Sequence, residues 1–183
     1  HSFTIIGSYG TGKSCFLLAL EKDLHSKGQH NLINPQTLSS CKKYEVLKIV
    51  GDYKDLASLM RNKLAIDGTA DNVLDELRNR YNQAKKRGSF LIIFIDEFGK
   101  VLEHAAKNDP EQELYFMQKL AEFVNVPTRQ ILLVTTLHQN FSAYARKLSS
   151  VQKEEWNKVK GRFKELVFIE PVEQLLYLAS KQN

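Results

Sequence analysis

A glycine-rich segment near the start of the chain, residues 7–14, has the residue types and spacing of a phosphate-binding loop. It fits the pattern G-x-x-x-x-G-K-[ST]. Its glycines allow backbone angles that side chains forbid, so successive N–H groups can point inward around a polyphosphate. Lys13 can then reach the β- and γ-phosphates, and the Ser14 hydroxyl can bind Mg²⁺. The expected nucleotide contacts are Gly7, Ser8, Tyr9, Gly10, Thr11, Gly12, Lys13, Ser14 and Cys15.

The residues on either side of this loop predict the elements that must hold it. Residues 3–6 form a short apolar run, which reads as a buried strand. Residues 15–24 carry apolar side chains at helical spacing, with Gly28 as the expected stop, and we expect the Cys15 thiol to pack within this helix. The alternative is a glycine-rich turn that matches by chance, but strand, loop and helix agree in order.

A second site is predicted where Asp96 and Glu97 end the apolar run 90–95. A continuous apolar run of this length suits a central parallel strand that is buried on both faces. Asp96 is placed to hold Mg²⁺, directly or through water, and Glu97 to act as general base toward an attacking water. The alternative is that both carboxylates are solvated residues that begin a loop.

The remaining pattern alternates strands with helices. Expected strands are 44–50, 131–134 and 166–169, and expected helices are one capped by Asp52, then 71–87, 101–107, 111–124, much of 141–160, and 172–180. Such alternation predicts an α/β fold with a parallel sheet and helices on both faces.

Composition sets wider bounds. At 183 residues, with 43% hydrophobic and 26% charged residues, the chain is expected to form one domain. It has no apolar run near 18 residues and opens directly on a strand, so neither a membrane span nor a signal peptide is expected. Its two cysteines make no disulfide framework, which favours a cytoplasmic setting. The net charge of +5 permits contact with nucleic acid without showing it.

Four segments together resemble the AAA+ ATPases, within the additional-strand, catalytic-glutamate class of P-loop proteins. They are GSYGTGKS at 7–14, FLIIFIDEFGK at 90–100, ILLVTT at 131–136 and GRFKELVFIEP at 161–171. The resemblance covers nearly the whole chain and implies ATP with Mg²⁺. It also implies a three-layer sandwich with a five-stranded parallel sheet in the order 5-1-4-3-2. The absence of an Asn-Lys-x-Asp motif argues against a Ras-like GTPase.

The resemblance also implies roles for residues beyond the two motifs. A polar residue at the end of the strand beside the Asp-Glu strand would be sensor 1; Thr136 is the first choice, then Thr135, then His138. The alternative for the threonines is strand propensity plus helix capping. Arg162 is a candidate arginine finger that enters a neighbouring subunit's site, which implies a homo-oligomer. The alternative is that Arg162 only belongs to a basic run.

A helical lid would follow residue 180 in this family, so we expect a core that belongs to a larger protein. Residues 135–156 are similar to large bacterial ATPases of anti-phage and mobile-element systems, and to origin-binding and signal-transducing STAND-like branches. The expected function is Mg-ATP hydrolysis that drives movement or assembly in a larger, DNA-linked defence machine with a DNA or protein partner. The alternative is a slowly hydrolysing switch that controls attached effector domains.

Other charged and aromatic residues carry weaker signals. Cys41, His25, His30 and His104 lack zinc-ligand spacing. The basic helix end with Arg78, Arg80, Lys85, Lys86 and Arg87 could meet DNA phosphates but is more simply a solvated face. Trp156 is expected to pack at a helix edge, and Arg129 to be a surface charge.

Overall fold

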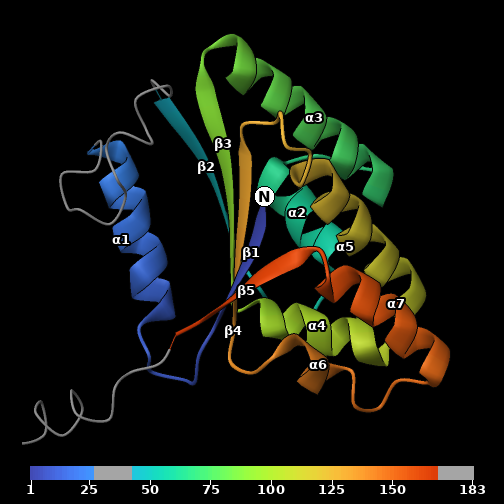
Figure 1. Cartoon of the computed structure of the whole chain (residues 1–183). Helices are drawn as coiled ribbons and strands as arrows, with labels where there is room; N and C mark the ends of the chain where they lie inside the picture. Colours follow the sequence, from blue (N-terminus) through green and yellow to red (C-terminus); the bar gives the residue numbers. More distant parts are fainter. Residues whose placement is uncertain (27–42, 169–183) are drawn as a thin grey trace, which may run out of the picture.

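The computed structural model describes residues 1–26 and 43–168, which build one five-stranded, all-parallel sheet (Figure 1). The strands are β1 (Ser2–Ile6), β2 (Lys43–Val50), β3 (Ser89–Asp96), β4 (Ile131–Leu137) and β5 (Phe163–Val167). Their order across the sheet is β2-β3-β4-β1-β5. This is the expected order 5-1-4-3-2 read from the other edge, so the predicted P-loop fold is confirmed.

Helices cover both faces of the sheet. They are α1 (Lys13–His25), α2 (Leu56–Leu64), α3 (Ala70–Lys86), α4 (Phe98–Lys107), α5 (Pro110–Val124), α6 (Phe141–Tyr144) and α7 (Ser150–Lys160). Among the described residues, α1 lies alone on one face, and α2, α3, α4, α5 and α7 lie on the other (Figure 1). No helix within residues 1–26 and 43–168 is both long enough and apolar enough to span a membrane.

Strand β3 is apolar throughout because it contributes to a core on each face of the sheet. Ile92 and Phe94 pack in the smaller cluster with Leu17 of α1. Ile93 and Ile95 alternate with them and belong to the larger cluster beneath the other helices. Burial on both faces is the physical reason that this strand shows a continuous apolar run.

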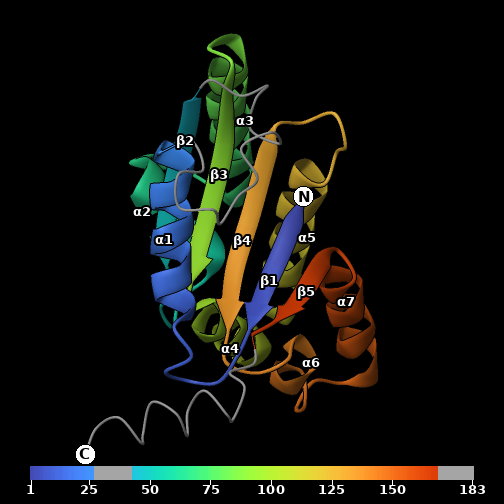
Figure 2. The ribbon, with the colours of Figure 1, turned by 60° about the vertical axis from the view of Figure 1, so that its left-hand side comes forward.

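The parallel register brings the carboxyl ends of the strands to one edge. Asp96 lies opposite Val50 of β2, and Ile95 lies opposite Thr135 of β4. Ile6, the last residue of β1, lies opposite Leu137. The arrowheads of these strands point to the lower edge in Figure 2, where β1 continues into the loop that leads to α1. Any site built from strand ends must therefore form there.

The cap expected for α2 was wrong by three residues. Asp55, not Asp52, accepts a hydrogen bond from the Ser58 amide at 2.7 Å. Asp52 instead accepts from the neighbouring Tyr53 amide. The reason is tertiary: the Gly51 amide donates to the Asp96 carbonyl at 2.7 Å, which keeps the segment extended beside β3 before the helix can begin.

Strand β5 begins at Phe163, three residues earlier than expected. It is an edge strand, and the residues after Phe163 are exposed or half-buried. Such a strand can carry polar residues, so a search for continuous apolar runs does not find where it begins. The expected loop after α1, with Gly28, His30 and Cys41, lies outside the described residues, as do the end of the expected fifth strand and the helix 172–180.

Candidate nucleotide-binding site

The loop between β1 and α1 has the backbone shape that its glycines predict. Gly10 and Gly12 have φ angles of 81° and 79°, in the left-handed region that favours glycine. At Gly7, a Cβ atom would approach Thr11 Oγ1 to 2.9 Å and the Phe168 carbonyl oxygen to 3.0 Å. Helix α1 starts at Lys13, so its unpaired N-terminal amides border the loop.

Lys13 lies inside the loop, with only 6% of its surface exposed. Its Nζ donates hydrogen bonds to the carbonyl oxygens of Gly7 and Ser8, both at 2.7 Å. Burial lowers the pKa of the Lys13 ammonium, and the nearby Asp96 carboxylate opposes that shift. The loop thus holds a positive charge at its centre, beside the carboxylate at the end of β3.

A hydrogen-bonded network joins the ends of β3 and β4. The Thr136 hydroxyl donates to Asp96 Oδ1 at 2.6 Å. The Glu97 amide donates to both Asp96 Oδ1, at 3.0 Å, and Thr136 Oγ1, at 2.9 Å. Thr135 takes no part, because adjacent strand residues face opposite ways; its hydroxyl pairs with Thr4 Oγ1 at 2.8 Å in the interior. Thr136 is thus the threonine that contacts the Asp96 carboxylate and the Glu97 amide.

Glu97 has an unusual backbone and an immediate partner. Its φ of 53° and ψ of 35° are left-handed, a conformation that costs a non-glycine residue on the order of 1 kcal/mol or more. It forms the N-cap of α4, and its carboxylate makes an ion pair with Lys100 one turn later. That pair raises the pKa of the Lys100 ammonium. The carboxylate is therefore held along α4 in this structure.

Ser14 and Asp96 lie around one small hollow of about 140 Å³, between α1 and the ends of β2 and β3. Asp96 Oδ1 is used by the network, while Oδ2 accepts no hydrogen bond from the residues that the structure describes. A hydroxyl and a carboxylate oxygen are the hard donors that Mg²⁺ prefers. Ser14 and Asp96 therefore offer donors that suit a magnesium ion, while the other residues around this hollow are mainly apolar.

An aromatic contact joins the phosphate loop to the residue that follows β4. The rings of Tyr9 and His138 are stacked, with centroids 3.6 Å apart, although Tyr9 is 79% exposed. His138 Nδ1 is buried and has no hydrogen-bond partner among the described residues. Burial lowers the pKa of His138, as does the Lys13 charge. Sequence reasoning missed this contact, since nothing in a local pattern links residues 129 positions apart.

Arg162 lies away from the other predicted site residues. It precedes Phe163, which pairs with Ser2 at the start of β1, so Arg162 sits at the amino edge of the sheet. Its guanidinium contacts Glu122 at 2.6 Å and the Lys158 carbonyl oxygen at 2.7 Å. Arg162 therefore does not contribute to the phosphate loop of its own chain.

Three expectations about single side chains are revised or made specific. Cys15 is exposed, so its expected packing within α1 was wrong. Arg129 is more than a surface charge: it stacks over the Phe123 ring at 4.5 Å and donates to the Phe123 carbonyl oxygen. Trp156 is fully buried and donates to the carbonyl oxygen of Phe141 at 2.9 Å.

Most cations of the basic helix end are already paired within the chain. Arg78 contacts Asp75, Arg80 contacts Glu76, and Arg87 contacts Glu45. These pairs favour the interpretation of this end of α3 as a solvated face.

Comparison with known proteins agrees with this geometry. Residues 3–158 match the family described as ATPases associated with various cellular activities (AAA). The ORC2 protein of Aeropyrum pernix, in its ADPNP-ADP complexes, is similar with a TM-score of 0.53 and 15% identity, over 91% of this chain and 41% of that chain. The ADP form of the same protein is similar with a TM-score of 0.52 and 17% identity, over 99% of this chain and 46% of that chain.

The chain spans less than half the length of these solved structures. A search of curated protein sequences found no match. The structural similarity, at this identity, concerns the fold alone. The family match covers most of the chain and includes the phosphate loop, the Asp-Glu strand and the Thr136 strand. The chain therefore belongs to the AAA family of ATPases and forms a P-loop ATPase core.

Proposed function

We propose that this domain binds Mg-ATP at residues 7–14 and hydrolyses it, with Glu97 as general base. The observation that supports this most is the network in which the Thr136 hydroxyl and the Glu97 amide share Asp96 Oδ1. That network holds the Asp96 carboxylate and the Thr136 hydroxyl at the strand ends near Lys13, and it fixes the backbone that carries the Glu97 carboxylate. These are the groups that phosphoryl transfer to water requires.

Each residue then has a defined task. Lys13 exchanges the carbonyl oxygens of Gly7 and Ser8 for the β- and γ-phosphates of the nucleotide, in a loop whose amides surround them. Ser14 and Asp96 would hold Mg²⁺, which, when bound, neutralises charge on the phosphate oxygens. Thr136 keeps Asp96 oriented and contacts the γ-phosphate side of the site.

The base must first leave its present partner. The Glu97 carboxylate pairs with Lys100, so it has to turn from α4 toward the phosphates before it can accept a proton from water. Its amide, held by Asp96 and Thr136, fixes the backbone while the side chain moves. Because the γ-phosphate is itself negative and repels a carboxylate, we infer that the Lys13 ammonium and Mg²⁺ must offset its charge for this turn to be favourable.

The test compares two carboxylates near the start and the middle of α4. Glu97→Gln is expected to keep ATP binding and to lower hydrolysis by roughly 100-fold or more, the usual contribution of a general base. Glu103→Gln, an exposed control on the same helix, should leave both unchanged. Binding is followed with a fluorescent ATP analogue and hydrolysis by phosphate release. Wild-type turnover in Glu97→Gln would refute the role of Glu97.

We further propose that the domain works as an oligomer within a larger machine that acts on DNA or protein, of the kind found in bacterial anti-phage and mobile-element systems. Arg162 is the candidate finger for a neighbour's site, and would exchange Glu122 for that neighbour's phosphates. The support is the family resemblance of 161–171 and of 135–156. A hydrolysis rate per subunit that rises with protein concentration, and does not rise in Arg162→Ala, is the expected result.

A nucleic-acid partner needs its own test, since most cations at the end of α3 are paired internally. Double-stranded DNA should raise hydrolysis and bind more tightly at low salt if DNA is the partner. Absence of both effects would leave a protein partner as the proposal.

The second candidate function is a slow switch, in which ATP binding orders an assembly and turnover only resets it. The Glu97–Lys100 ion pair favours it, because a restrained base gives slow hydrolysis. Under this function Glu97→Gln locks the biological output on, whereas in a motor the same change stops the output. A flat, low rate at all protein concentrations, with tight ATP binding, would also favour the switch.

A further inference from the structure

A cavity of about 460 Å³ lies among helices on the face of the sheet opposite α1. It is bordered by the first turns of α2, α3 and α5 and by the last turn of α4. It shares no residue with the hollow that contains Ser14 and Asp96. The polar side chains that matter for its chemistry are Asp55, Arg61, His104, Asp109 and Glu113.

Glu113 is the residue that makes this cavity unusual. Its side chain is 8% exposed, and its Oε1 contacts His104 Nδ1 at 2.7 Å. Its Oε2 is buried and has no hydrogen-bond partner in the described part of the chain. Burial raises the pKa of the Glu113 carboxyl, while His104 acts to lower it. A buried carboxylate oxygen without a partner is costly unless a donor reaches it.

The charges around Glu113 decide what kind of donor suits it. The Asp55 and Asp109 carboxylates cap α2 and α5, and their charges act on Glu113. Arg61 is the one arginine among the lining residues of the cavity. Its guanidinium donates to the Gly68 carbonyl oxygen and the Ser58 hydroxyl rather than to Glu113. Three carboxylates therefore face one arginine and one histidine, so the cavity favours a cation that donates hydrogen bonds.

We propose that this cavity binds an alkylguanidinium or alkylammonium group, whose N–H donates to Glu113 Oε2 once the side chains that cover this buried oxygen move aside. Its volume lies in the range of small-ligand sites, which is roughly 300–1,000 Å³. Apolar lining from Leu56, Ala57 and Phe116 can contact the methylene groups while the charged end meets the carboxylates. The proposal does not rest on ATP hydrolysis, because the cavity and the phosphate loop use different residues.

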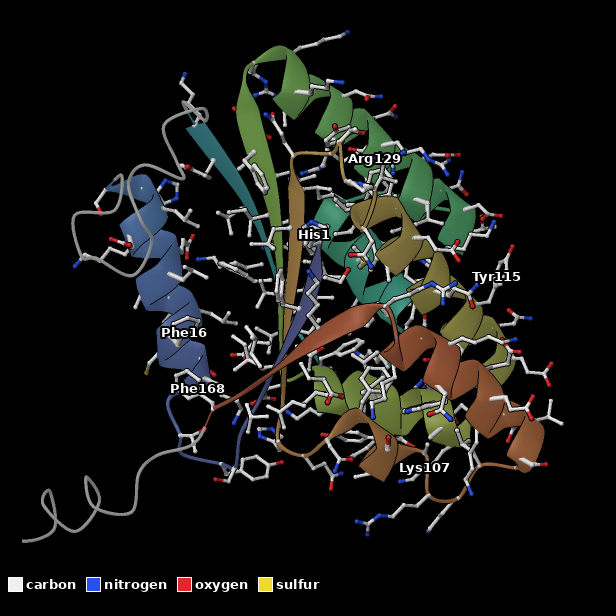
Figure 3. All side chains as sticks on the ribbon, in the orientation of Figure 1. His1, Phe16, Lys107, Tyr115, Arg129 and Phe168 are labelled. Carbon is white, nitrogen blue, oxygen red and sulfur yellow. The ribbon has the colours of Figure 1, made fainter. Side chains whose placement is uncertain are left out.

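The cation has two possible sources, a free amine or an arginine or lysine side chain on a protein segment. A second hollow, of about 300 Å³, extends to Tyr115 and shares four lining residues with the cavity, which are Thr69, Ala70, Gln112 and Phe116. Tyr115 is 57% exposed and lies on the outward side of α5 (Figure 3). An apolar residue next to a bound arginine could rest on this ring, whereas a free amine could not use it.

The experiment titrates the 183-residue chain with n-butylguanidinium and follows the His104 ring signals by NMR. We expect saturable shifts, at least tenfold weaker binding in Glu113→Gln, and unchanged binding in Glu111→Gln, an exposed carboxylate in the same turn of α5. Neutral n-butylurea, of nearly the same shape, should bind at least tenfold more weakly to the wild type. Equal binding of n-butylurea, or no saturable shift with n-butylguanidinium, would overturn the proposal without any variant.

A capped peptide, acetyl-Arg-Leu-Leu-amide, then separates the two sources. Tighter binding than n-butylguanidinium, lost in Tyr115→Ala, supports a side chain of a protein segment. Equal binding of both compounds, unchanged in Tyr115→Ala, supports a free amine. Binding of the peptide that survives Glu113→Gln at full strength would place the contact outside the cavity and overturn the proposal.

Discussion

The hydroxyl of Thr136 offers the most direct test of the site, because one atom can be removed at almost constant volume. Thr136→Val deletes the oxygen that donates to Asp96 Oδ1 and accepts from the Glu97 amide. A hydrogen bond to a charged group contributes roughly 1.5–3 kcal/mol. If that whole contribution is felt in the transition state, hydrolysis should fall about 10- to 150-fold, since each 1.36 kcal/mol is tenfold in rate.

The assay is phosphate release at saturating Mg-ATP, with nucleotide binding and folded fraction measured on the same samples. Thr135→Val is the matched control, because Thr135 is equally buried but bonds Thr4 rather than Asp96. It should lose about 1 kcal/mol of unfolding free energy and keep its rate. Thr136→Ser should retain most activity. A wild-type rate in Thr136→Val, or an equal loss in Thr135→Val, would refute the reasoning.

Three further outcomes follow from packing and charge. Gly51→Ala should lower the free energy of unfolding by about 1–3 kcal/mol, because a Cβ there overlaps the Glu97 carbonyl oxygen. Gly161→Ala is the control and should leave this free energy unchanged, since a Cβ there has no contact closer than 3.4 Å. Denaturant melts compare the two variants. Lys100→Met should raise basal hydrolysis severalfold by freeing the base, and an unchanged or lower rate would contradict that restraint. Trp156→Phe should cost about 1–3 kcal/mol through its lost buried hydrogen bond, seen as a lower urea midpoint.

The local sequence pattern was enough to predict the phosphate loop and the strand that carries Asp96. The loop's chemistry depends on contiguous residues, since left-handed glycines and a lysine at a helix start need no distant partner. The apolar run before Asp96 follows from burial on both faces of the sheet. Alternating strands and helices likewise predicted a parallel sheet, and the family resemblance supplied its order, which the structure confirms.

The ends of helices and strands were harder to predict from the sequence, because tertiary contacts set them. The α2 helix starts late since Gly51 is bound to β3, and Asp55 rather than Asp52 becomes its cap. Cys15 has helical neighbours on both sides, yet only the packing of α1 against the sheet decides that its thiol faces outward. Such choices depend on which side of an element meets the core.

The sequence by itself determined that this chain carries a phosphate loop and an Asp-Glu strand end in an α/β fold. Only the tertiary structure decided which hydroxyl contacts Asp96, because a one-residue step along β4 directs Thr135 to Thr4 of β1 and Thr136 to Asp96 of β3. It alone brought the Tyr9 ring onto His138 and placed Glu113 in the lining of a cavity between three helix starts. These contacts join residues from separate elements, and their geometry depends on sheet register and helix packing, which no local spacing encodes.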